Sequence, residues 1–158
     1  MIPGNLLKSV KITRLTFDGT NYLLAAGTTD ALESDALDMS GYDGVLFLAL
    51  TGDNANTAVL KMEVEGCASS GGSYTLYDTD AASTFTMDAT NGDYKQLAID
   101  VVDPVHQFLK VKTTRATANI VLSGLIAIQY NGSKLPITQA VTAGQFMVAP
   151  TCAVSPTT

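Results

Sequence analysis

The chain has 158 residues, a length that suits one domain with its own hydrophobic core. Hydrophobic residues make up 46% of it and charged residues only 15%, against a usual charged share of about a quarter. The net charge of −6 repels a phosphate backbone, so we expect no nucleic-acid partner. A small domain this apolar is predicted to place part of its surface against other subunits.

The N-terminal segment predicts a strand rather than a targeting signal. Residues 1–14 lack the basic region and the long apolar run of a signal peptide, and no stretch of the chain reaches the ~18 apolar residues of a membrane span. We therefore expect a soluble protein made in the cytoplasm, with no membrane partner. Residues 6–15 alternate Val10 and Ile12 against Lys11 and Thr13, which is the pattern of a first strand.

Two strong strand patterns follow a weak helical one. Residues 29–39 come nearest to a helix, but their leucines are wrongly spaced and glycines follow, so we expect a single helical turn at most. Residues 44–53 form a continuous apolar run that predicts a buried strand. Residues 58–66 alternate apolar with charged side chains, which predicts a strand with one face in water. The linker GDNANT, residues 52–57, has the composition of a hairpin loop, so these two strands are expected to pair.

The second half of the chain continues the strand pattern after a polar insertion. Residues 66–93 are a long polar loop with short strand fragments at best. Strand patterns then occupy residues 94–102, 107–115 and 119–130, and Gly124 in the last of them is expected to mark a bulge. Many short strands without helices between them predict an all-β fold: a single antiparallel β-sandwich, jelly-roll-like.

This sandwich is expected to span residues 1–134, and residues 135–158 to form a separate extended arm. The arm is too apolar for a disordered tail and too short for a second domain. An arm of this kind would lie on the domain itself or on a neighbouring subunit.

The only histidine, His106, lies in the segment DPVHQFLKVKTTR, residues 103–115. A Ser–His–Asp set would need a serine on a sharp turn, but no G-x-S-x-G motif exists and Ser123 lies inside an apolar strand. We expect Asp103-Pro104 to form a turn and Val105 to Thr113 a strand. In that strand Phe108 would point inward, and the lysines would lie on a face that is wet or meets acidic neighbours. His106 would be partly buried and bonded to a loop carbonyl, so no enzymatic role is expected.

No residue pattern indicates a metal or a cofactor. Cys67 and Cys152 match no C-x-x-C spacing, and a single histidine leaves too few ligands for zinc. The sequence DTDAAS, residues 78–83, resembles only the beginning of a calcium loop, and no phosphate-binding glycine loop is present. The sequence leaves open whether the two cysteines form a disulfide, and it favours free thiols.

Residues 37–66 resemble the central hairpin of the decoration, or cement, proteins of tailed-phage heads. The matching features are the turn Tyr42-Asp43, the buried strand around Phe47, the loop Gly52-Asp53 and the strand Leu60 to Glu65. The resemblance continues through residues 107–115 and 119–132 and covers roughly residues 35–132. The sequence departs from the family pattern at Lys110, where an arginine is expected, and in its long apolar arm.

The resemblance implies a non-enzymatic homotrimer on the outer surface of the virion head, with the major capsid protein as its partner. Binding would rest on the N-terminal segment, the long loop and the arm. The expected interface residues are Leu6, Leu7, Tyr74, Tyr77, Phe146, Met147 and Val148. The alternative is a carbohydrate-binding or receptor-binding sandwich module of a phage tail or fibre, for which Tyr74 and Tyr77 would supply stacking surfaces although the chain has no Trp.

Overall fold

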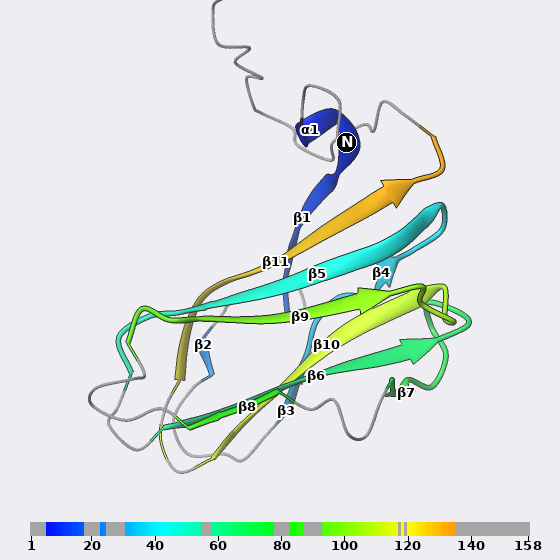
Figure 1. The fold of residues 1–158 in the computed structure, drawn as a ribbon. Helices are drawn as coiled ribbons and strands as arrows, with labels where there is room; N and C mark the ends of the chain where they lie inside the picture. Colours follow the sequence, from blue (N-terminus) through cyan, green and yellow to red (C-terminus); the bar gives the residue numbers. More distant parts are fainter. Residues whose placement is uncertain are drawn as a thin grey trace, which may run out of the picture.

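The computed structural model of the chain is nearly all β and forms two antiparallel sheets (Figure 1). It describes residues 6–17, 23–24, 31–54, 58–77, 83–86, 93–116, 118 and 120–134. The elements are α1 (Leu6–Ser9), β1 (Lys11–Leu15), β2 (Leu23–Leu24), β3 (Ala31–Glu33), β4 (Leu37–Asp38), β5 (Tyr42–Thr51), β6 (Val59–Cys67), β7 (Thr75–Leu76), β8 (Ser83–Thr86), β9 (Gln96–Val102), β10 (Phe108–Ala116) and β11 (Ile120–Gly132). The prediction of an all-β sandwich is confirmed. The one helix in this part of the chain, α1, is too short to cross a membrane.

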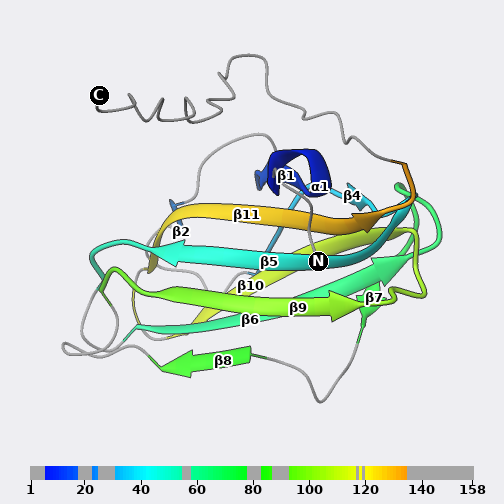
Figure 2. The ribbon, with the colours of Figure 1, turned by 45° about the horizontal axis from the view of Figure 1, so that its top comes forward.

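Each sheet takes strands from both halves of the chain (Figure 2). The first sheet has the order β1-β11-β5-β9, with β2 also on β11. The second has the order β3-β10-β6-β7, with β4 on β10 and β8 on β6. Strands that neighbour one another in a sheet are therefore mostly distant in sequence. The jelly-roll description stays a prediction, as does the arm, because residues 135–158 lie outside the described part of the chain.

The predicted hairpin between residues 44–53 and 58–66 is wrong. β5 pairs with β11 and β9 in the first sheet, whereas β6 pairs with β10, β7 and β8 in the second. Asn54 holds the described beginning of the linker, residues 52–54: its buried amide donates to the Gly52 carbonyl at 2.9 Å and accepts from the Val121 N–H at 2.6 Å. Turn residues indicate that the chain changes direction, but they do not indicate which sheet the next strand joins.

The core lies between the sheets and is built by alternate residues of both. Phe47 from β5 and Leu60 from β6 are fully buried in one continuous hydrophobic cluster. β11 carries a bulge at Ser123, because Leu122 pairs with Thr51 and Gly124 with Leu50. The bulge expected at Gly124 is thus confirmed, but it lies one residue earlier, at Ser123.

Two short segments differ from expectation. Residues 29–39 contain β3 and β4, which gain backbone pairing on β10 in place of a helical turn. Conversely, the beginning of the expected first strand is helical: the Val10 N–H donates to the Leu6 carbonyl at 3.0 Å, and β1 begins only at Lys11. Segments this short, with two to four residues each, carry too few side chains for a reliable period, so their contacts with the rest of the fold decide their structure.

Candidate binding surface

Three connections meet at one end of the sandwich, which we call the loop end: residues 39–42, residues 68–77 and residues 103–107. Backbone hydrogen bonds tie them together. The Met39 N–H donates to the Gln107 carbonyl at 2.7 Å, and the Asp103 N–H to the Asp43 carbonyl at 2.7 Å. The Val105 N–H donates to the Tyr77 hydroxyl oxygen at 2.7 Å. Each connection is therefore held by another, and the loop end is a fixed surface.

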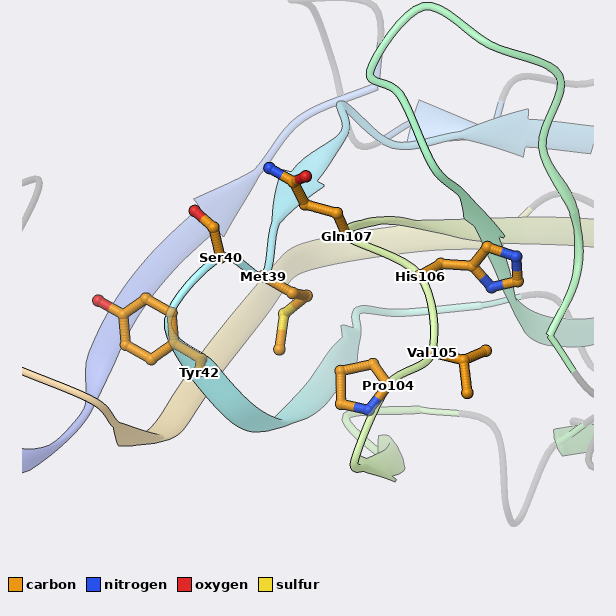
Figure 3. A pocket seen from close by; sticks show the side chains of 7 residues that line it. All are labelled: Met39, Ser40, Tyr42, Pro104, Val105, His106 and Gln107. Carbon is orange, nitrogen blue, oxygen red and sulfur yellow. The ribbon is translucent and has the colours of Figure 1, made fainter.

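A hollow of about 210 Å³ opens in this surface (Figure 3). It is lined by Met39, Ser40, Tyr42, Pro104, Val105, His106 and Gln107. Figure 3 shows the Met39 side chain between the two segments that line the hollow, and the Gln107 amide directed toward Ser40. The hollow combines one aromatic ring and aliphatic side chains with a few polar groups, which is the composition of a small binding site.

Asp38 organises the polar side of the hollow. Its Oδ1 accepts the Ser40 N–H at 2.9 Å and the Gln107 Nε2–H at 3.2 Å. Partial burial by itself raises the pKa of Asp38, but these hydrogen bonds and the charge of Lys11 together outweigh it and hold the pKa below 3.8. Asp38 thus stays ionised at neutral pH and fixes the two segments that face each other across the hollow.

The loop end also exposes apolar side chains. Val105 is 83% exposed, Val102 61% and Leu76 38%. Val102 and Val105 flank Asp103, whose φ of 49° makes the tight turn between β9 and the following loop. Because backbone hydrogen bonds hold this turn, the two valines are presented to solvent in a fixed arrangement, which is a feature of binding surfaces.

His106 has a packing role in this region. Its ring meets the Tyr77 ring edge-on, with 5.9 Å between centroids and 72° between planes. It also lies against Gly66, where an added Cβ would come within 2.8 Å of the imidazole Nδ1. The predicted bond to a loop carbonyl is absent: Nδ1 is buried and has no hydrogen-bond partner among the described residues. The expected partial burial of His106 is confirmed, and the ring is held by van der Waals contact with Tyr77 and Gly66.

The prediction that Phe108 points inward is wrong. β10 begins at Phe108, not at Val105, and its fully buried residues are Leu109 and Val111. Alternation places Phe108 on the same face as Lys110, because these residues are two apart. Phe108 is half-buried on the outer face of the second sheet, paired with Cys67.

The outer face of the second sheet carries paired charges. Lys112 lies 3.0 Å from Glu65, and Lys110 lies 3.4 Å from Glu33. The lysines therefore meet acidic neighbours, as expected. The prediction that the polar face of β6 is wet is wrong for Glu65, which is only 5% exposed. The hydrogen bond to Glu65 raises the pKa of Lys112, and burial offsets this only in part.

The structure separates the predicted interface residues. Leu6 is 57% exposed on α1, where Leu7 also lies although its side chain is outside the description. Tyr74 is half-buried, with its ring 4.4 Å from the Lys110 Nζ and its hydroxyl donating to the Ser70 carbonyl at 3.1 Å. Tyr77 packs against the core.

Tyr74 therefore belongs to the outer face of the second sheet and Tyr77 to the interior side, so the two rings do not form one surface. Phe146, Met147 and Val148 lie outside the described residues, as does Cys152. Cys67 is a free thiol. Among the residues that the structure describes, no group of three or more His, Cys, Asp or Glu side chains could hold a metal ion.

Sequence reasoning missed the exposed valines and the hollow. The signal was present in VVDPV, residues 101–105, where an Asp-Pro turn interrupts a run of valines. Valines on both sides of a turn cannot all reach the core. A scan against protein-family models finds no matching family, and a search of the curated proteins finds no similar sequence.

Proposed function

We propose that this protein is a structural protein of the virion, a decoration protein that binds the outer surface of a tailed-phage head as a homotrimer. Its partner is the major capsid protein, and its effect is to stabilise the shell. The observation that carries the proposal is the loop end, where Val102 and Val105 are exposed on a turn fixed by hydrogen bonds.

Such a surface suits attachment for an energetic reason. Fully burying a valine against a partner contributes about 1.5–3 kcal/mol. A fixed turn loses little conformational freedom on binding, so most of this contribution is kept. Three copies of the surface in a trimer bind together, and each attached copy raises the effective concentration of the others. The shell is then stabilised because several subunits must separate before it ruptures.

The charge of the chain supports the outer surface as the location. The net charge of −6 repels packaged DNA, so the inner surface of a head is unfavourable for this protein. The loop end offers an apolar contact for that surface through the exposed Val102 and Val105.

The test is an add-back assay on capsids that lack the protein. We expect the purified protein to co-sediment in repeated copies and to raise the rupture temperature of the capsids. The double variant Val102→Asp, Val105→Asp should bind at least ~10-fold more weakly, because two carboxylates replace the apolar contact.

Tyr94→Asp is the matched control. Tyr94 is 78% exposed and lies before β9, whereas the valines lie at the other end of that strand, so its variant should bind like the parent protein. A strictly monomeric protein that does not bind capsids would overturn the proposal. If the valine variant binds capsids as tightly as the parent protein, the loop end is not the attachment surface.

The hollow favours a second candidate, a carbohydrate-binding or receptor-binding module of a tail or fibre. A volume of about 210 Å³ beside the Tyr42 ring and the Gln107 amide could hold one sugar residue. This candidate predicts glycan-array binding that is lost in Tyr42→Ala and kept in Tyr94→Ala. An array without signal would discard it.

A further inference from the structure

The hollow at the loop end has apolar walls and a charged edge. Met39, Tyr42, Pro104 and Val105 supply most of its apolar surface, and Figure 3 shows the Met39 side chain between the two segments that line it. The exposed carboxylate of Asp38 lies at the edge, where its Oδ1 accepts hydrogen bonds from two of the lining residues. The hollow therefore matches a ligand that has an apolar stem and a polar head.

The charge around the hollow is mainly negative. Three exposed carboxylates adjoin the lining residues in the chain, namely Asp38, Asp43 and Asp103. Lys11 is a basic side chain nearby: its charge acts on Asp38, and its Nζ lies 5.8 Å from the centroid of the Tyr42 ring. Three negative charges against this one positive charge favour a cationic head and disfavour an anionic one.

A buried acceptor lies behind the Met39 side chain. Gln129 is fully buried, and its Nε2–H donates to the Asp38 carbonyl at 2.8 Å and lies 3.5 Å from the Met39 sulfur. The Gln129 Oε1 is buried and has no hydrogen-bond partner among the described residues. Met39 is unbranched and has several rotatable bonds, so it can move aside for a ligand. A donor that enters beside Met39 thus gains an acceptor that these residues leave unused.

We infer that the hollow receives a lysine side chain of a protein partner. The methylenes of that lysine pack against Met39, Tyr42 and Pro104, and its ammonium reaches the Asp38 carboxylate and the Gln129 Oε1. Lysine commonly buries its stem along apolar surface in this way while its head stays among polar groups. A hollow of about 210 Å³ has room for the five heavy atoms of the side chain, since one water needs only about 10–15 Å³ of such space.

An ammonium fits this hollow better than an arginine head does. The Asp38 Oδ1 already accepts two hydrogen bonds, which interferes with the paired bonds of a guanidinium, whereas the three donors of an ammonium can go to separate acceptors. The assignment deepens the proposed attachment by the loop end. It rests on that function for the capsid as the source of the lysine, and on the hollow alone for the ammonium.

The first test uses n-butylammonium, which is a lysine side chain without its backbone, and the full chain labelled with ¹³C at its methionine methyl groups. We expect n-butylammonium to shift the Met39 methyl signal saturably, with a dissociation constant on the order of 10 mM. The signal of Met62, which is fully buried in the core, should not move. 1-Butanol at the same ionic strength, with a hydroxyl in place of the ammonium, should bind about 5-fold more weakly.

Three variants test the charges. Asp38→Asn keeps the Oδ1 acceptor and removes the charge, so it should weaken n-butylammonium about 5-fold and leave 1-butanol unchanged. Lys11→Met should instead bind n-butylammonium about 3-fold more tightly, because a like charge is removed. Lys95→Met is the matched control for Lys11→Met. Lys95 precedes β9, at the end of that strand opposite to the hollow, so this variant changes the net charge equally and should bind like the parent protein.

Salt decides the question if Asp38→Asn fails to fold. Raising NaCl from about 50 mM to about 500 mM should weaken n-butylammonium several-fold and leave 1-butanol unchanged. Equal affinities for the two compounds, or no shift of the Met39 signal, overturn the assignment. A saturable shift with a neutral methyl glycoside alone also overturns it, because the hollow then accepts a sugar.

Capsids test the source of the lysine. The parent protein should bind untreated capsids about 5-fold more tightly than Asp38→Asn, and acetylation of the capsid lysines should remove this difference. Equal binding to untreated capsids, or a difference that persists after acetylation, overturns a capsid lysine as the occupant. If the parent protein does not bind capsids at all, the proposed attachment fails, and the n-butylammonium titration still decides whether the hollow accepts an ammonium.

Discussion

At the scale of single residues, Glu65 shows how burial decides what an ion pair contributes. It is 5% exposed, and Lys112 provides its ion pair at 3.0 Å. Removing one partner of a buried pair leaves the other charge uncompensated, whereas an exposed pair contributes little. The neighbouring pair on the same face, Lys110 with Glu33, is of the exposed kind, since the Glu33 side chain is 45% exposed.

We therefore predict that Lys112→Met destabilises the protein by about 2 kcal/mol. Urea unfolding at neutral pH, followed by far-UV circular dichroism, measures the change. Lys110→Met, on the same strand and face, is the control. It also removes the contact of the Lys110 ammonium with the Tyr74 ring at 4.4 Å, and it should still cost less than the Lys112 variant. Equal losses in the two variants would mean that burial of the acidic partner does not decide the effect.

Residue spacing was enough to place Lys110 and Lys112 on one face, which was expected to be wet or to meet acidic neighbours. It was not enough for Glu65, since its burial depends on residues of other elements that cover it. Phe108 shows a different failure: hydrophobicity suggested an inward position, although its spacing from Lys110 already placed it outward.

At the scale of elements, the bulge in β11 decides which side chains reach the core. Leu122 and Leu125 are both buried although three positions separate them, because Ser123 adds one residue between the ladder pairs on either side. Deleting Ser123 should restore a regular alternation with both leucines still inward. Deleting a residue from the regular part of β11 should instead turn every residue before it to the other face.

We predict that deletion of Ser123 costs at most about 2 kcal/mol, whereas deletion of Ala127 prevents folding. Deleting Ala127 exposes Ile120, Leu122 and Leu125, and each lost burial costs about 1.5–3 kcal/mol. Thermal unfolding followed by circular dichroism distinguishes the two. A cooperative transition in the Ala127 deletion would show that β11 can pair in either register.

Local sequence predicted most of these elements, because long strands show their period directly. β5, β6, β9 and β11 all lie where apolar runs or alternation placed them. The assignment of strands to sheets was not accessible in the same way. GDNANT has the composition of a hairpin loop, yet β5 and β6 belong to different sheets. The pairing partner of each strand is distant in sequence, so no local pattern identifies it.

At the scale of the whole molecule, several groups hold protons more tightly than their ordinary pKa values imply. Burial raises the pKa of Tyr42 and of Tyr74, and the hydrogen bond to Glu65 raises that of Lys112. Burial, followed by the hydrogen bond and charge of Asp100, raises the pKa of Tyr130 to about 12. Near neutral pH these groups bind their protons in both the folded and the unfolded state, so their effect on stability appears only at alkaline pH.

The direction in which pH changes the stability follows from the number of protons bound by the folded and the unfolded chain. Tyr130 has an ordinary pKa of 10.0, so between pH 10 and pH 12 the folded protein keeps a proton that the unfolded chain has released. Its stabilising contribution is complete below pH 10 and is lost as pH rises through about 12. Asp38 acts in the opposite direction: its lowered pKa gives a contribution that is complete above 3.8 and is lost as pH falls.

We therefore predict that the free energy of unfolding declines above pH 10 and that Tyr130→Phe makes this decline shallower. The variant should also lose about 1 kcal/mol at pH 8, because its hydroxyl donates to Asp100 Oδ1 at 2.8 Å. Urea midpoints measured from pH 8 to pH 11.5 test both effects, because the midpoints of the parent protein and of Tyr130→Phe should converge as pH rises. Tyr94→Phe, with a side chain that is 78% exposed, is the control and should follow the parent curve. If the Tyr130→Phe curve instead stays parallel to that of the parent, the tyrosine hydroxyl is not the group that links alkaline pH to folding.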